Sequence, residues 1–94
     1  MTKECIAMVL ESEGLGAGKD GRFSIPENRE AVCLVEAPGD VVPIERLVAV
    51  ELRDKFVVLQ NGKHERFFFV YENVMGFRLL ASSTARERVA GFGR

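Results

Sequence analysis

The sequence predicts an all-β, mainly antiparallel domain: a small β-barrel or β-roll of six or seven short strands, SH3-like or PH-like, with a short C-terminal helical turn. Three observations lead to this prediction. The apolar residues come in short runs with turn residues between them, which is typical of many short strands. The dipeptide Asn61-Gly62 joins two β-prone runs, as in a hairpin. No amphipathic segment of about 12 residues is available for the crossover that parallel strands require.

Length and composition indicate a single folded domain over residues 1–94. The hydrophobic fraction of 47% and the formal net charge of −1 exclude general disorder. The same charge balance argues against a dedicated nucleic-acid binder, which usually carries a clear basic excess. The apolar run 5–10 is too short for a signal sequence, and no stretch approaches the roughly 18 apolar residues of a membrane span. We therefore expect a cytoplasmic protein without membrane association.

The first half of the chain is expected to open with a strand over residues 5–10. Both faces of this segment are apolar, so we expect it to be buried on both sides. Four glycines in the segment 14–21 predict a flexible loop. The elements expected next are a short strand at 22–25, a strand at 30–36, a turn at 37–40 and an extended segment at 41–44.

The second half begins with a half-buried strand over residues 47–52, whose residues Val48, Val50 and Leu52 share one face. The hairpin then pairs residues 55–60 with residues 63–71. A two-residue turn would pair Phe56 with Phe67 and leave Val57 facing Arg66, so a one-residue bulge is an alternative.

A last strand is expected over residues 74–81. In the tail, 82–94, Thr84 and Glu87 have the spacing of a capping box. The tail is therefore either a short helical cap or a frayed end.

The motifs that carry chemistry are weak. Residues 16–21 spell G-x-G-x-x-G, but Arg-Phe-Ser-Ile-Pro follows and cannot start the helix that would hold a pyrophosphate. Cys5, Cys33 and His64 are the soft metal ligands, and they lack the paired spacing of a zinc site. In a reducing cytoplasm the two cysteines are expected as thiols rather than a disulfide. No nucleophile motif surrounds a serine. We therefore expect no enzyme, no cofactor and no metal.

The aromatic run Phe67-Phe68-Phe69-Val70-Tyr71 allows two interpretations of equal weight. It is either a central strand packed on both sides, or an edge or face that a partner covers. A homodimer would hide the second face of so small a roll. A basic end next to these aromatics would suit single-stranded nucleic acid, although ordinary surface charge is the simpler interpretation. Its candidate members are Lys63, His64, Arg66, Arg78, Arg86, Arg88 and Arg94.

Two local resemblances to known families are present. Asp54-Lys-Phe-Val-Val-Leu followed by Val70-Tyr71 resembles the second half of the bacterial Sm-like RNA chaperones, over less than a third of the chain. Those proteins open with a helix, where a strand is expected here. The segments Cys5-Ile-Ala-Met-Val-Leu and Ile44-Glu-Arg-Leu-Val-Ala-Val-Glu-Leu resemble small nickel-binding accessory proteins of carbon monoxide dehydrogenase. In that family the cysteine directly follows the initiator methionine, whereas here it stands at position 5.

These observations predict a non-enzymatic module that acts by binding another protein or a second copy of itself. An Sm-like nucleic-acid-binding module is the first alternative, and a metal-binding accessory protein using Cys5 and Cys33 is the second. The expected interaction surface consists of Lys63, His64, Arg66, Phe67, Phe69 and Tyr71.

Overall fold

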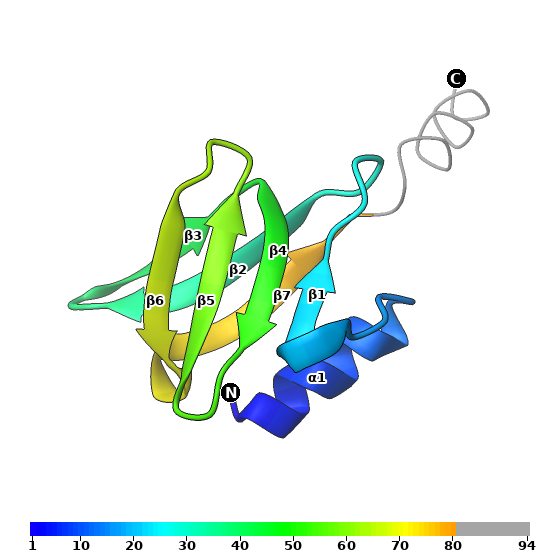
Figure 1. Cartoon of the computed structure of the whole chain (residues 1–94). Coiled ribbons are helices and arrows are strands. Elements are labelled where there is room, and N and C mark those ends of the chain that lie inside the picture. Colours follow the sequence, from blue (N-terminus) through cyan, green and yellow to red (C-terminus); the bar gives the residue numbers. More distant parts are fainter. Residues whose placement is uncertain (81–94) are drawn as a thin grey trace, which may run out of the picture.

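A computed structural model describes residues 1–80 and shows one short helix and two antiparallel sheets packed around one core (Figure 1). The first sheet has the strand order β1-β4-β5-β6, and the second has the order β3-β2-β7. The elements are α1 (Lys3–Ser12), η1 (Lys19–Gly21), β1 (Arg22–Ser24), β2 (Ala31–Ala37), β3 (Asp40–Ile44), β4 (Leu47–Leu52), β5 (Phe56–Asn61), β6 (Arg66–Val70), η2 (Tyr71–Asn73) and β7 (Val74–Leu79). The predicted mainly antiparallel β architecture is confirmed. No closed barrel is formed by these strands, because their ladders make two separate sheets.

The expected strand over residues 5–10 is wrong, because this segment belongs to helix α1. Thr2 is the N-cap, and its hydroxyl accepts a hydrogen bond from the Cys5 backbone nitrogen at 3.0 Å. Ile6 and Leu10, four residues apart, lie on one face of the helix and are buried, whereas Met8 is 63% exposed. A short apolar run does not distinguish strand from helix by itself, and burial of this one face decided the outcome. In the part of the chain that is described, no helix is long and apolar enough to cross a membrane.

The three-stranded sheet is built around β2. β2 and β3 form a hairpin around the expected turn, with Ala37 paired to Asp40 and Gly39 at a positive φ of 79°. Strands β4, β5 and β6 of the other sheet follow β3 in the chain. β7 then pairs with β2, so that Ala31 lies opposite Leu79. The ladder shifts register where Leu34 pairs with Gly76 and Val35 pairs with Val74, which leaves Met75 as a bulged residue in β7.

The four-stranded sheet contains the predicted hairpin, but in a different register. Leu59 lies opposite Phe67 and Val57 lies opposite Phe69, whereas a two-residue turn would have set Phe56 opposite Phe67. The pairing of Val57 with Arg66 that a two-residue turn would give does not occur, since Arg66 pairs with Gln60. The observed register places the apolar residues of both strands on the same face.

The Asn61 side chain explains the longer turn. Its Oδ1 accepts hydrogen bonds from the backbone nitrogens of Lys63 (2.9 Å) and Glu65 (3.0 Å), which is an Asx-type turn. The Asn61 backbone nitrogen also donates to the Glu65 carbonyl at 3.1 Å, closing a loop of three residues. His64, the last of them, adopts the left-handed conformation with φ 68°, as such three-residue loops require.

The core lies between the two sheets and under α1. Phe23, Ile6, Leu10, Leu59, Val50, Val57, Val74 and Cys33 are its largest fully buried side chains. Phe67 and Phe69 of β6 are partly buried and pack against this cluster. The inner face of the four-stranded sheet is thus apolar along its length, and its outer face is free to carry other chemistry.

The helical assignment of α1 predicts an unequal response to truncation. Leu10→Ala removes a fully buried side chain and is expected to lower the free energy of unfolding by about 2–5 kcal/mol. Met8→Ala removes an exposed side chain and is expected to change it by less than about 0.5 kcal/mol. Urea unfolding followed by circular dichroism measures both values. Equal losses at positions 8 and 10 would contradict the helix, since the two residues share a face only in a strand.

Candidate interaction surface

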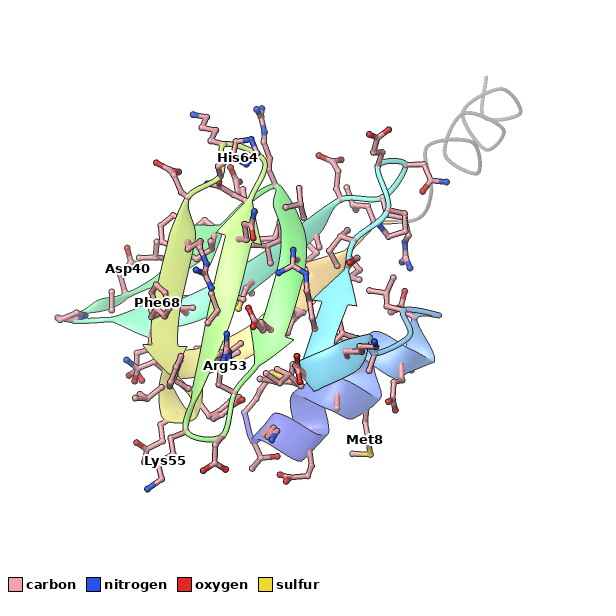
Figure 2. The ribbon with its side chains drawn as sticks, in the orientation of Figure 1. Met8, Asp40, Arg53, Lys55, His64 and Phe68 are labelled. Atoms are coloured by element: carbon pink, nitrogen blue, oxygen red, sulfur yellow. The ribbon has the colours of Figure 1, made fainter. Side chains whose placement is uncertain are left out.

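The outer face of the four-stranded sheet brings residues from four strands into ordered rows. One row crosses the whole sheet, because Arg22 pairs with Glu51, Glu51 with Val58, and Val58 with Phe68. The row below it places Phe56 opposite Val70. Directly paired residues point to the same side of a sheet, so these side chains form one continuous surface, here called the outer face. Figure 2 shows Phe68 and Arg53 on this face, with His64 at one end of the sheet and Lys55 at the other.

The outer face has an apolar floor beneath its longer side chains. Val58 and Ala49 are each only 2% exposed, yet neither belongs to the core cluster between the sheets. They are therefore covered from outside by side chains of this face. Arginine side chains commonly cover apolar surface with their methylene groups while the guanidinium stays in water.

Charge on this face is concentrated around Glu51. Its carboxylate lies 2.6 Å from a guanidinium nitrogen of Arg53, 3.6 Å from Arg66 and 3.9 Å from Arg22. The Glu51 side chain is 12% exposed, whereas each arginine side chain is close to half exposed. Three guanidinium groups thus share one carboxylate. The cluster carries a charge of +3 − 1 = +2 on a protein whose formal net charge is −1.

Exposed aromatic rings adjoin this cluster. Phe68 is 58% exposed, and the Arg66 guanidinium carbon lies 5.4 Å from the centre of its ring, within cation–π range. The Phe56 ring, 38% exposed, has its centre 6.1 Å from that of Phe68. Val70, 48% exposed, extends the apolar area toward the end of β6. The outer face therefore combines fixed positive charge with flat apolar surface.

The backbone of β6 has a free side as well. β6 pairs with β5 alone among the described strands. The Asn61 backbone nitrogen donates to the Glu65 carbonyl oxygen, so residues 61 and 65 form a hydrogen-bonded pair. Such pairs alternate along an antiparallel ladder, and the amides of Phe67 and Phe69 therefore point toward β5. By the same alternation, the amides of Arg66 and Phe68 point away from the sheet, at an open edge.

The structure distributes the sequence-predicted site residues over four places. Lys63 and His64 lie exposed in the hairpin turn, while Arg66 lies on the outer face. Phe67 and Phe69 point inward against the core. Tyr71 lies in η2, at the far end of β6 from the turn.

Tyr71 has a structural contact there, because its hydroxyl donates to the Arg53 carbonyl oxygen. Burial, together with the Asp54 and Glu4 carboxylates, raises the pKa of this phenol above its ordinary value. The hydroxyl therefore remains protonated and able to donate at neutral pH. Tyr71 joins the β4–β5 turn to η2.

The proposed basic end is not a single surface. Arg78 lies on β7 of the other sheet, and Arg86, Arg88 and Arg94 fall outside the described residues, as does the expected capping box of the tail. Lys63 instead lines a shallow cavity of about 520 Å³ beside the hairpin turn, with Glu45, Arg46 and Glu65. Two bases and two acids balance one another in this cavity, so it has no charge preference for a ligand.

Close packing against β4, and not phosphate binding, explains a glycine in the segment 14–21. This segment contains the short 3-10 helix η1 followed directly by strand β1, so no α-helix begins there whose N-terminus could receive a phosphate. Gly21 has φ 72°, and a Cβ at this position would lie 2.9 Å from the Leu52 carbonyl oxygen. Only glycine therefore permits this close approach to β4.

The two cysteines are both free thiols. Cys33 is fully buried in the core, and Cys5 is half-buried on α1. Burial raises the pKa of Cys33 to about 12, against a smaller lowering by the N-terminal ammonium. Among the described residues no group of three or more His, Cys, Asp or Glu side chains lies together in a way that could hold a metal ion.

Sequence reasoning found Arg66 of the outer face and missed Phe68, Phe56, Glu51, Arg53 and Arg22. The alternation of β6 was visible, but which of its two faces points inward depends on the hairpin register. The Glu51 cluster joins residues from β1, β4 and β6, and no local spacing relates them. Comparison with known proteins adds no assignment, since no family model, curated protein or solved structure matches this chain.

The buried Cys33 thiol predicts a loss of stability in alkali. Its folded-state pKa of about 12 exceeds the ordinary value of 9.0. The contribution of the protonated thiol to the free energy of unfolding is therefore complete below pH 9 and is lost as the pH rises from 9 to 12. We expect Cys33→Ala to flatten the fall of the unfolding free energy over this range, relative to the wild type. Urea unfolding at a series of pH values measures the slopes, with Cys5→Ala as the control. A Cys33→Ala profile parallel to the wild type would refute the assignment.

Proposed function

We propose that this chain is a non-enzymatic interaction module, an SH3-like or PH-like roll that binds a protein partner through the outer face and the β6 edge. The observation that carries the proposal is that Phe68 and Val70 are about half exposed on an edge strand whose outward amides are unpaired within the described residues. Large exposed apolar groups on a free edge are typical of an association surface. The return of β7 to β2 after η2 supports the roll, because it wraps the strands around a single core.

The two interpretations of the aromatic run predict different exposures for its side chains. Within the run, Phe68 faces outward, while its neighbours Phe67 and Phe69 face the core. β6 is an edge strand of its sheet, and its outward-facing Phe68 and Val70 are about half exposed, so it is neither central nor packed on both faces. This arrangement favours coverage by a partner over a purely structural role. Truncation of Phe68 is accordingly expected to affect association more than folding.

Solution mass tests the proposal for a second copy as partner. We expect light scattering on a sizing column to give twice the 10.5 kDa mass of one chain at high protein concentration. Phe68→Glu, which places a charge in the apolar part of the surface, is expected to give a monomer with an unchanged circular dichroism spectrum. Met8→Glu is the matched control, because Met8 is equally exposed but lies on α1. A wild-type monomer at every concentration would contradict self-association.

Single-stranded nucleic acid binding is a second candidate function, favoured by the Glu51 cluster. Guanidinium groups bind phosphates, and an adjacent exposed ring such as Phe68 offers a surface on which a base can stack. The ligand would be a short single strand lying across β5 and β6.

Fluorescence anisotropy with a labelled RNA of about 10 nucleotides tests this second candidate. We expect affinity to fall with salt, and Arg66→Gln to reduce the logarithmic salt slope by about 0.7. Glu51→Gln is expected to tighten binding, because it raises the charge of the cluster. Lys19→Gln is the control, since it removes the same charge from the 3-10 helix η1. Equal effects of Arg66→Gln and Lys19→Gln, or no salt-sensitive binding, would exclude this function.

A further inference from the structure

β6 is the sheet edge among the described strands that carries the fewest features opposing strand addition. Edge strands are usually protected by shortness, proline, bulges or charged side chains, lysine above all. β1 has only 3 residues, β3 contains Pro43, and β7 is bulged at Met75. β6 runs regularly from Arg66 to Val70 without proline, glycine, lysine or bulge, its charged residue is Arg66, and its pairing with β5 is uninterrupted. An incoming strand can therefore add to the four-stranded sheet more readily at β6 than at β1.

We propose that this edge pairs with the β6 strand of a second copy, antiparallel and centred on Phe68. This inference rests on the proposed function, and it names both the partner and the geometry. Phe68 is the middle residue of the 5-residue strand, so a twofold axis beside it gives full overlap. The amides that point outward belong to Arg66 and Phe68 and, by the same alternation, Val70. Pairing about Phe68 therefore joins Phe68 to its own copy by two backbone hydrogen bonds.

Charge along the strand is compatible with this register. Arg66 is the charged residue of β6, and it would lie opposite Val70 of the second copy rather than opposite another arginine. The two arginines would stand four residues apart, roughly 13 Å at the usual rise of a strand. That separation exceeds the screening length of about 8 Å at physiological salt. Each Arg66 also keeps its own Glu51 partner at 3.6 Å.

The pairing would also cover apolar surface. Phe68 is the most exposed residue of the aromatic run, and the axis would bring the two Phe68 rings together on the outer face. Directly paired aromatic residues in a sheet attract each other. The two four-stranded sheets would become one continuous sheet. A pairing of two short strands buries less area than a large obligate interface, so the dimer is expected to depend on concentration.

Hydrogen exchange followed by NMR tests the backbone pairing. In a concentrated sample, the outward-pointing Phe68 amide is expected to exchange at least about tenfold more slowly than in a dilute one. The Phe67 and Phe69 amides, which already pair with β5, serve as internal references. A Phe68 amide that exchanges equally fast at both concentrations, in a sample that light scattering shows to be dimeric, would overturn the inference. It would leave the proposed function intact, because the dimer would then use another surface.

Disulfide trapping tests the register in the full chain. In a Cys5→Ser background, the double variant Arg66→Cys, Val70→Cys keeps both Phe68 rings and is expected to form a covalent dimer under mild oxidation, because position 66 lies opposite position 70 of the second copy. Hydrogen-bonded antiparallel partners have Cα atoms about 5.5 Å apart, within the range that a disulfide spans. Met8→Cys in the same background is the control and is expected to remain monomeric on a non-reducing gel. Equal cross-linking of the two variants, or none of the double variant, would overturn the β6 pairing. A chain that is monomeric by mass at every concentration would instead overturn self-association as a whole.

Discussion

The register of the β5–β6 hairpin is the constraint on which the rest of the structure depends. The Asn61 side chain takes over hydrogen bonds that a tighter turn would make with the backbone, and His64 adopts the left-handed conformation that closes the loop. The observed pairing differs from that of a two-residue turn by an odd number of residues. A shift by an odd number of residues moves every side chain of β6 to the opposite face of the sheet. The small turn therefore decides which aromatic residues enter the core.

With that register set, the two faces of one short strand acquire different roles. Phe67 and Phe69 pack beside Val57 and Leu59 and complete the core between the sheets. Phe68 and Arg66 are turned outward beside Phe56 and Glu51. The stability of the fold and the chemistry of the outer face thus arise from neighbouring residues of the same segment, separated only by the alternation of a strand.

The outer face is itself a layered arrangement rather than a simple solvated surface. Val58 and Ala49 are as inaccessible as core residues, although they lie outside the core cluster between the sheets. The position of Glu51 matters for this layer, since its carboxylate attracts guanidinium groups from both neighbouring directions across the sheet. Ion pairs with half-exposed arginines contribute little to stability on their own. Their more important effect here is to hold three positive groups over an apolar floor at defined positions.

The sequence by itself determined the β-rich architecture, the hairpin at Asn61 and the turn before Asp40. These features depend on residues that are neighbours in the chain, and local backbone preferences are expressed in such neighbours. Only the tertiary structure decided that residues 5–10 form a helix. The segment is apolar on all sides and fits a strand or a helix, and the helix is stabilised by the burial of Ile6 and Leu10 in the core. Only the tertiary structure assembled Glu51 with Arg22 and Arg66, since strand pairing brings together residues that no spacing in the sequence relates. Strand pairing also left β6 at an edge, and the hairpin register turned only some of its residues outward, so these residues rather than the whole aromatic run form the candidate interaction surface.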